Sequence, residues 1–127
     1  MNADIKAKWV AALRSGQYEQ TDAVLRDADR FCCLGVLCDL YSKESGTEWE
    51  PDFASQFTMH GNGGTLPVEV RRWADLPHEY GAYVAVTKRY DEGNEDTTVY
   101  HSPSLTELND QWQYDFHQIA DVIEQQL

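Results

Sequence analysis

The segment that most constrains the fold covers residues 31–45 and reads Phe-Cys-Cys-Leu-Gly-Val-Leu-Cys-Asp-Leu-Tyr-Ser-Lys-Glu-Ser. Its first ten residues are apolar on nearly every side of a helix, and such a helix must be buried in the packing. We predict a central buried helix here, with Asp29 as its N-cap and Gly46 just after its end. Gly35 within the helix costs about 1 kcal/mol relative to Ala. We therefore expect a neighbouring element to approach the helix closely at Gly35.

Shorter elements are predicted on both sides of this helix. An amphipathic helix is expected over residues 3–15, where Gly16 ends it, and two short strands or an ordered loop over residues 17–30. Residues 46–66 predict a loop, for which we expect three aromatic anchors, namely Trp49, Phe53 and Phe57.

The second half of the chain predicts three helices and a hairpin. We expect a helix from Pro67 to Ala74, with Val68, Val70 and Trp73 on its apolar side. A β-hairpin of residues 82–90 and 96–101 follows. We then expect a helix that begins with a capping box at Ser104–Glu107, and a last helix from about Tyr114. The predicted fold class is α+β: a helix-dominated single domain over residues 1–127, with a central buried helix and a small antiparallel β-hairpin or sheet.

The three cysteines, Cys32, Cys33 and Cys38, lie within the apolar segment. Cys32 and Cys33 are near the predicted start of a helix and close to Arg30, a setting that can activate a thiol as a nucleophile. Free cysteine is, however, among the most buried residue types, so we favour buried, structural thiols. The sequence has no CxxC, HxH or HExxH spacing. We expect no catalytic residue, no metal site and no cofactor.

The charge of the chain is strongly acidic and unevenly distributed. The formal net charge is −12, and residues 91–127 carry nine acidic residues without a Lys or Arg. Such a field repels phosphate backbones and attracts basic surfaces, including the grooves in which other proteins hold DNA or RNA. We expect no direct binding to nucleic acid. No apolar run approaches the roughly 18 residues of a membrane span and no signal segment follows Met1, so we expect no membrane association.

Three segments resemble a group of small proteins encoded by bacteriophages and prophages. They are Arg30–Leu40, the stretch Leu66–Leu76 with its Trp73-Ala74-Asp75-Leu76 end, and Leu105–Asp110 followed by Phe116–Glu124. The resemblance covers most of the chain and carries over no catalytic residue. It implies a phage product that acts in the host bacterial cytoplasm, where small acidic phage proteins often inhibit host defence systems.

From the acidic block and this resemblance we predict a binding protein rather than an enzyme. The expected partner is a host protein with a basic nucleic-acid-binding groove, such as a CRISPR effector or a restriction complex, and the acidic protein would act there as a mimic of DNA. The predicted partner-binding residues are Asp91, Glu92, Glu95, Asp96, Tyr100, Asp110, Trp112 and Asp115, with Tyr100 and Trp112 as aromatic anchors. A solvated face that only keeps the protein soluble is the alternative, and a homodimer remains open.

A second hypothesis is a small-ligand binder that sequesters a nucleotide signal of host defence. Glycine-rich backbone before a helix can hold an anion, and the residues for this site are Gly61, Gly63, Gly64, Arg71 and Arg72. A flexible surface loop is the plainer interpretation of these glycines. A third hypothesis is a structural or assembly component of the virion.

Overall fold

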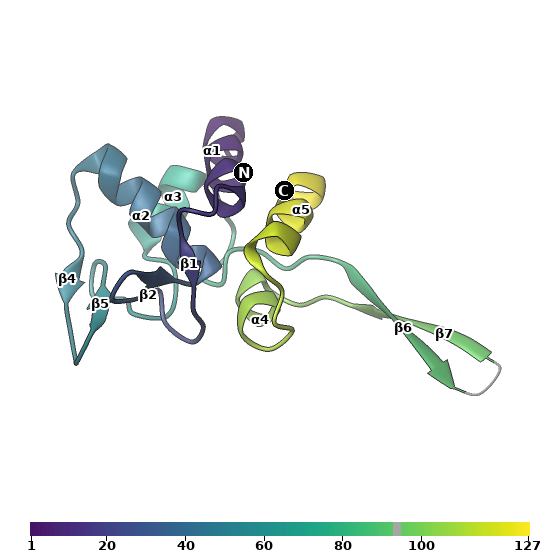
Figure 1. Ribbon diagram of the computed structural model, residues 1–127. Coiled ribbons are helices and arrows are strands. Elements are labelled where there is room, and N and C mark those ends of the chain that lie inside the picture. Colours follow the sequence, from purple (N-terminus) through teal and green to yellow (C-terminus); the bar gives the residue numbers. More distant parts are fainter. Residues whose placement is uncertain (93–94) are drawn as a thin grey trace.

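The central helix of the predicted fold is present in the computed structural model, which describes residues 1–92 and 95–127 and, for residues 90–92, 95 and 96, the backbone alone. The described elements are α1 (Ala3–Arg14), β1 (Glu19–Gln20), β2 (Arg26–Asp27), β3 (Arg30–Phe31), α2 (Cys33–Ser45), β4 (Glu50–Pro51), β5 (Gln56–Thr58), α3 (Val68–Ala74), β6 (Val86–Glu92), β7 (Glu95–His101), α4 (Leu105–Asp110) and α5 (Phe116–Gln126). The chain is an α+β domain, with helices and short strands gathered in one body from which β6 and β7 extend (Figure 1).

Helix α2 is buried over its first half. Residues 33–38 are all inaccessible to solvent or nearly so, which confirms the expected central helix. The helix begins two residues later than predicted, because Phe31 pairs in a strand and Cys32 is the N-cap, whose Sγ accepts a hydrogen bond from the Gly35 N–H at 3.4 Å. The prediction of Asp29 as N-cap is therefore wrong. Gly46 ends the helix as predicted, in the left-handed conformation with φ 78°.

Gly35 lies where the chain crosses the first turn of α2. A Cβ atom on Gly35 would lie 1.8 Å from the carbonyl oxygen of Leu25, so the expected close approach is confirmed. Leu25 is fully buried, and its carbonyl oxygen also accepts a hydrogen bond from the Cys32 N–H at 3.2 Å. The absence of a side chain at residue 35 thus allows the segment before β2 to pack directly on the helix backbone.

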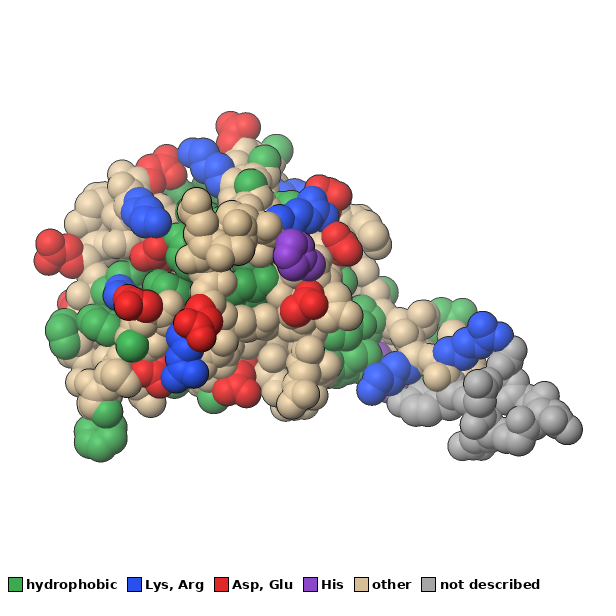
Figure 2. Space-filling model, viewed as in Figure 1, with side chains coloured by type: hydrophobic (Ala, Val, Ile, Leu, Met, Phe, Trp, Pro, Cys, Tyr) green, Lys and Arg blue, Asp and Glu red, His purple; other side chains and the backbone are tan. Residues whose placement is uncertain are grey.

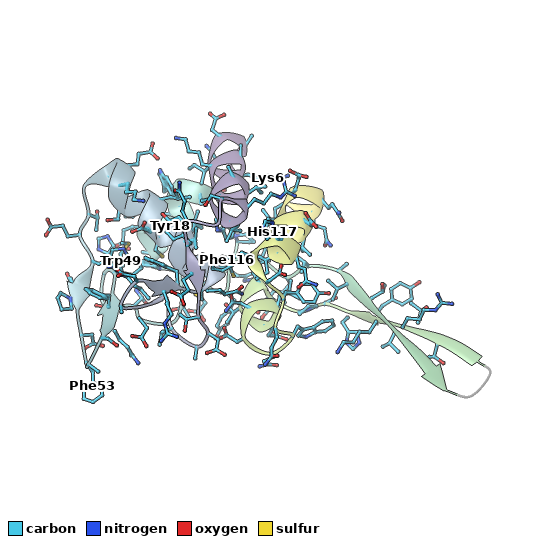
Figure 3. The ribbon with its side chains drawn as sticks, in the orientation of Figure 1. Lys6, Tyr18, Trp49, Phe53, Phe116 and His117 are labelled. Atoms are coloured by element: carbon cyan, nitrogen blue, oxygen red, sulfur yellow. The ribbon has the colours of Figure 1, made fainter. Side chains whose placement is uncertain are left out.

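Five short strands form a mixed sheet in the order β1-β3-β2-β5-β4, in which β1 and β3 are parallel and the other neighbours are antiparallel. Two of them, β4 and β5, lie in the segment predicted as a loop. Trp49 and Phe57 are half-buried there, and the Arg26 guanidinium lies over the Phe57 ring, 4.2 Å from its centroid. Phe53 is instead 80% exposed and points away from the body (Figure 3), so its prediction as an anchor is wrong.

The remaining helices cover α2 and one another. Helices α1 and α5 pack side by side (Figure 1), and the Trp9 indole donates a hydrogen bond to the Cys33 carbonyl oxygen at 3.0 Å. In α3, Val70 is buried and Trp73 is half-buried, but Val68 is 45% exposed, contrary to its predicted place on the apolar side. Among the described residues, no helix is both long enough and apolar enough to cross a membrane.

The predicted β-hairpin is confirmed as β6 and β7, whose register runs from Val86 opposite His101 to Glu92 opposite Glu95. The strands are longer than expected at their free end, since they include three of the five residues between the predicted strands, Asp91, Glu92 and Glu95, while β6 begins four residues later than predicted. After the hairpin, the Ser104 side chain caps α4 by accepting a hydrogen bond from the Glu107 N–H at 3.2 Å.

Candidate interaction surface

The hairpin is joined to the body by backbone and amide hydrogen bonds at its base. The side chain of Gln126, at the end of α5, accepts a hydrogen bond from the Ala85 N–H and donates one to the Ala85 carbonyl oxygen, each at 2.7 Å. The Val84 N–H donates to the Pro103 carbonyl oxygen at 2.9 Å. These contacts fix the two chain segments from which the hairpin extends.

Trp112, a predicted anchor for a partner, supports the hairpin from the body. Its ring is half-buried against the core and lies edge-on to His101 and Tyr114, at centroid distances of 5.0 and 6.0 Å. The Lys88 ammonium from β6 lies 4.7 Å from the centroid of the same ring, a cation–π geometry. The Trp112 ring is thus already packed against residues of this chain, and only its exposed remainder is available to contact a partner.

Tyr100, the other predicted anchor, is the most exposed large apolar residue described on the hairpin. It is 81% exposed and lies opposite Thr87. Val99 beside it is 36% exposed. An accessible tyrosine on a projecting strand has both an apolar ring and a hydroxyl available to a binding surface.

Four predicted acidic residues occupy the free end of the hairpin. Their side chains lie outside the described residues, but the backbone register is defined: Asp91 is opposite Asp96, and Glu92 is opposite Glu95. Like charges directly opposite each other destabilise a strand pair. The hairpin therefore ends in two adjacent like-charged pairs, which we call the acidic end (Asp91, Glu92, Glu95 and Asp96). On the body side of it, Figure 2 shows basic side chains on the projecting part of the molecule, where Lys88 and Arg89 are exposed.

The other predicted acidic residues have roles within the body. Asp115 caps α5, with its Oδ1 accepting a hydrogen bond from the Gln118 N–H at 2.8 Å and the Gln118 side chain accepting from the Asp115 N–H. Asp110 accepts a hydrogen bond from the Asn109 side chain at 2.9 Å. The structure separates both residues from the acidic end.

The negative charge of residues 91–127 is partly neutralised by Arg14 from the N-terminal helix α1. The Arg14 guanidinium pairs with Asp121 at 2.7 Å and with Glu124 at 2.9 Å. The hydrogen bond from Arg14 lowers the pKa of the Glu124 carboxyl. The sequence did not indicate this pairing, because Arg14 is more than a hundred residues away along the chain.

Asn109 is a buried polar contact point that the sequence analysis did not single out. Its Oδ1 accepts from the Cys33 N–H at 3.1 Å and from the Gln20 amide at 2.9 Å, and its Nδ2 donates to the Thr21 carbonyl oxygen at 2.9 Å. It borders an open hollow of about 420 Å³ with a mostly polar lining. Because these bonds and the one to Asp110 use both of its polar atoms, Asn109 joins α4 to β1 and α2 and has no remaining donor for a ligand.

The glycines of the alternative ligand site are engaged in contacts within the chain. Gly61 forms a tight turn with His60, both with positive φ, closed by two hydrogen bonds between Met59 and Asn62. The carbonyl oxygen of Gly63 accepts a hydrogen bond from the Leu25 N–H at 2.7 Å, and Gly64 adjoins this contact.

The arginines of that site lie on the last turn of α3, where Arg71 donates to the Pro77 carbonyl oxygen at 2.8 Å. The hollow of about 290 Å³ beside Arg71 and Arg72 is lined by Val68, Asp75 and Leu76 and by none of the glycines. An anion there would meet the end of a helix that carries negative partial charge.

A polar cluster on the face of α2 was also missed by the sequence analysis. Asp39 accepts hydrogen bonds from the Tyr18 hydroxyl at 2.6 Å and the Trp49 indole at 3.1 Å, and pairs with Lys43 at 3.2 Å (Figure 3 labels Tyr18 and Trp49). Burial raises the pKa of Asp39, but these three partners outweigh burial and lower the pKa below its usual 3.8. The cluster fastens two loop side chains, Tyr18 just before β1 and Trp49 just before β4, to α2, and these contacts account for it as a structural feature.

The cysteines are free and buried, as predicted. Burial raises the pKa of the Cys32 thiol to about 11 and the pKa of Cys33 and Cys38 well above the usual value. A thiol that stays protonated is a poor nucleophile, so the position of Cys32 at a helix N-terminus does not activate it.

The comparisons with known proteins add a family. No curated protein and no solved structure matches the chain. The family described as a domain of unknown function, DUF8296, matches residues 1–127, and the chain belongs to that family.

Proposed function

We propose that the protein is a phage product that binds a host protein through its projecting hairpin and inhibits that protein by occupying a basic nucleic-acid-binding groove. A bacterial defence factor of the CRISPR or restriction type is the partner class. The acidic end enters the groove, and Tyr100 supplies an apolar contact beside it. The site of action is the host cytoplasm.

The observation that carries this proposal is the acidic end itself. Its two like-charged register pairs, Asp91 with Asp96 and Glu92 with Glu95, work against the hairpin in isolation. Several other acids of the C-terminal block serve the fold: Asp115 caps a helix, and Asp121 and Glu124 pair with Arg14. A basic surface would neutralise the negative charge of the acidic end. The same negative charge repels nucleic acid itself.

The shape of the hairpin suits a groove rather than a flat surface. A two-stranded ribbon is narrow and extends from the body (Figure 1), and its exposed residues on both faces contact a surrounding wall. Charge complementarity of this kind mainly sets the association rate and the specificity, and salt screens it. Binding should therefore weaken steeply as the ionic strength rises.

The test is capture of partners from a bacterial lysate with the tagged protein, at low and at high salt, followed by elution with short duplex DNA. The first variant neutralises the acidic end with Asp91→Asn, Glu92→Gln, Glu95→Gln and Asp96→Asn. The matched control removes the same four charges from exposed residues elsewhere, with Glu44→Gln, Glu48→Gln, Glu50→Gln and Asp52→Asn.

The proposal is supported if the wild type and the control capture a nucleic-acid-binding protein, the first variant does not capture it, and DNA or high salt releases it. Equal capture by both variants contradicts it, since the net charge rather than the acidic end would then explain the binding. If no protein is captured at either salt, the nucleotide-binding alternative is tested next, by thermal unfolding with cyclic and ADP-ribose nucleotides.

A further inference from the structure

The turn between β4 and β5 holds the ring of Phe53 in solvent on an ordered backbone. Phe53 is 80% exposed and points away from the body (Figure 3). The Asp52 N–H donates to the Gln56 carbonyl oxygen at 2.9 Å, and the Gln56 N–H donates to the Phe53 carbonyl oxygen at 3.1 Å. The Ala28 N–H ties this turn to β2 through the Ser55 carbonyl oxygen at 2.7 Å. A large apolar ring on a pre-ordered turn loses little conformational entropy when another surface covers it.

The same chain has an apolar hollow of about 510 Å³ beside α1 and the end of α5. Its apolar lining comes from one face of α1 and consists of Ala3, Ala7, Val10 and Ala11. Val10 is buried and the three alanines are exposed, so that methyl groups alone cover the outer face of the helix there. A ring that enters this hollow buries apolar surface on both sides of the contact.

The charges around the turn and around the hollow are complementary. Glu50 and Asp52 precede the exposed ring, are exposed themselves, and form no ion pair with a described residue. Of the charged residues that line the hollow, Arg14 and Glu124 pair with each other at 2.9 Å, whereas Lys6 forms no ion pair with a described residue. The acids beside the ring and the unpaired cation beside the hollow favour this contact over contact with another acidic surface.

We propose that the Phe53 turn (residues 52–56) of one copy of this chain inserts its ring into the hollow of a second copy. The ring packs on Ala7 and Val10, and Asp52 approaches Lys6 of the second copy. The turn and the α1–α5 pair lie on different sides of the body (Figure 1). The contact is therefore head-to-tail: each pair of copies keeps one unused turn and one unused hollow, and association continues beyond two chains.

One inserted ring gives a weak contact. Stable interfaces bury about 1,200–2,000 Å² in total, and one aromatic side chain contributes about 150–250 Å². We therefore expect a Kd of about 0.1–1 mM for each contact. The association should be visible only at high protein concentration, and it should depend steeply on the ring.

The self-association goes beyond the proposed function and does not depend on it. The hairpin extends from the opposite side of the body from the Phe53 turn (Figure 1), so that a chain can use both. The control variant of the capture experiment neutralises Glu50 and Asp52; it should associate with itself less and still capture the partner through the acidic end. Each experiment thus answers one proposal alone.

Sedimentation equilibrium over protein concentrations up to about 1 mM measures the average mass. The wild type should rise from 14.5 kDa to more than twice that mass. Phe53→Ser removes the ring, and Ala7→Gln fills the hollow with a polar side chain that suits a helix; each should stay at 14.5 kDa. As a control, Tyr83→Ser removes another exposed aromatic ring, which is 52% exposed, and should associate as the wild type does.

An equimolar mixture of the two variants tests the contact itself. Phe53→Ser keeps the hollow and Ala7→Gln keeps the ring, so the mixture should form one contact and stop at two chains, about 29 kDa. Circular dichroism checks that each variant is folded. A wild type that stays at 14.5 kDa at all concentrations overturns the proposal. Association of either variant alone, or a mixture of folded variants that stays monomeric, overturns it as well.

Nuclear magnetic resonance locates both sides of the contact in the same mixture. Isotope-labelled Phe53→Ser titrated with unlabelled Ala7→Gln should change the amide shifts of residues 3–14 and of the end of α5. With the labels exchanged, the changes should move to residues 50–57. Changes at the hairpin in either titration would show that the copies meet through another surface, and would contradict the proposed contact.

Discussion

The contact at Gly35 gives the most direct test of the fold. Gly35→Ala adds one methyl group, whose carbon would lie 1.8 Å from the Leu25 carbonyl oxygen. Ordinary van der Waals contact begins at 3.4 Å, so the two backbones must separate by about 1.6 Å. Leu25 is itself held on its other side by the hydrogen bond to Gly63. The strain therefore falls on backbone rather than on a side chain that could rotate away.

The expected loss of stability is about 3 kcal/mol. Overpacking a well-filled core costs about 1–3 kcal/mol, and a backbone obstacle belongs at the upper end. Separation also breaks the Cys32 N–H hydrogen bond to the Leu25 carbonyl oxygen, worth about 1 kcal/mol. Ala gains about 1 kcal/mol over Gly in helix propensity, which offsets that bond. With a urea dependence of about 1.5 kcal/mol per M, the unfolding midpoint should fall by about 2 M.

Urea unfolding followed by far-UV circular dichroism measures this shift, and Gly16→Ala is the matched control. Gly16 has φ 73°, and no atom lies within 4 Å of an added Cβ. Gly16→Ala should therefore lower the free energy of unfolding only by the cost of placing Ala in the left-handed conformation, about 1 kcal/mol. Helix propensity alone predicts the opposite order, because Gly35 is inside a helix and Gly16 is not. If Gly35→Ala is as stable as the wild type or more stable, the close approach described above is wrong.

Three further predictions concern buried polar groups. Asn109→Ala leaves the Cys33 N–H and two other partners without their hydrogen bonds, and should cost about 3 kcal/mol in urea unfolding; no loss would contradict its linking role. Asp39 has a pKa in the folded state below its usual 3.8, so its contribution to the free energy of unfolding is complete above that unfolded value and is lost as the pH falls through the folded pKa. Asp39→Asn should therefore flatten the fall of the urea midpoint in acid, and an unchanged pH dependence would refute this. The thiols of Cys32, Cys33 and Cys38 should react with a chromogenic disulfide only on unfolding, and fast labelling of native protein would show that they are accessible.

Elements with a strong local signal were predicted from the sequence. The apolar run predicted α2 and its burial, and Gly46 predicted where that helix ends. The alternating residues of 82–101 predicted the hairpin. In each case the information lies within a few neighbouring residues, namely a periodicity, a capping residue or a turn.

Most of the five-stranded sheet had no such signal: two short strands or an ordered loop were expected over residues 17–30, where β1 and β2 lie, but the sequence did not predict the strands that pair with them. Its strands are two or three residues long, too short to show an alternation of apolar and polar residues. The pairing of β2 with β5 joins segments about thirty residues apart, Arg26 with Phe57, and only the folded chain brings them together. Phe53 was expected to be an anchor because it is aromatic, yet aromatic residues at a turn between two short strands can remain exposed.

The candidate site was predicted as one acidic block, and the fold divides that block by function. Asp115 is taken up by a helix cap, and Asp121 and Glu124 by Arg14, which a charge count along the chain cannot show. Sequence proximity kept the residues of the acidic end together because a hairpin brings neighbours into register. Since like charges opposite each other oppose a strand pair, the acidic end is the part of the block that a basic surface of a partner would stabilise most, whereas the acids paired with Arg14 already have a cation.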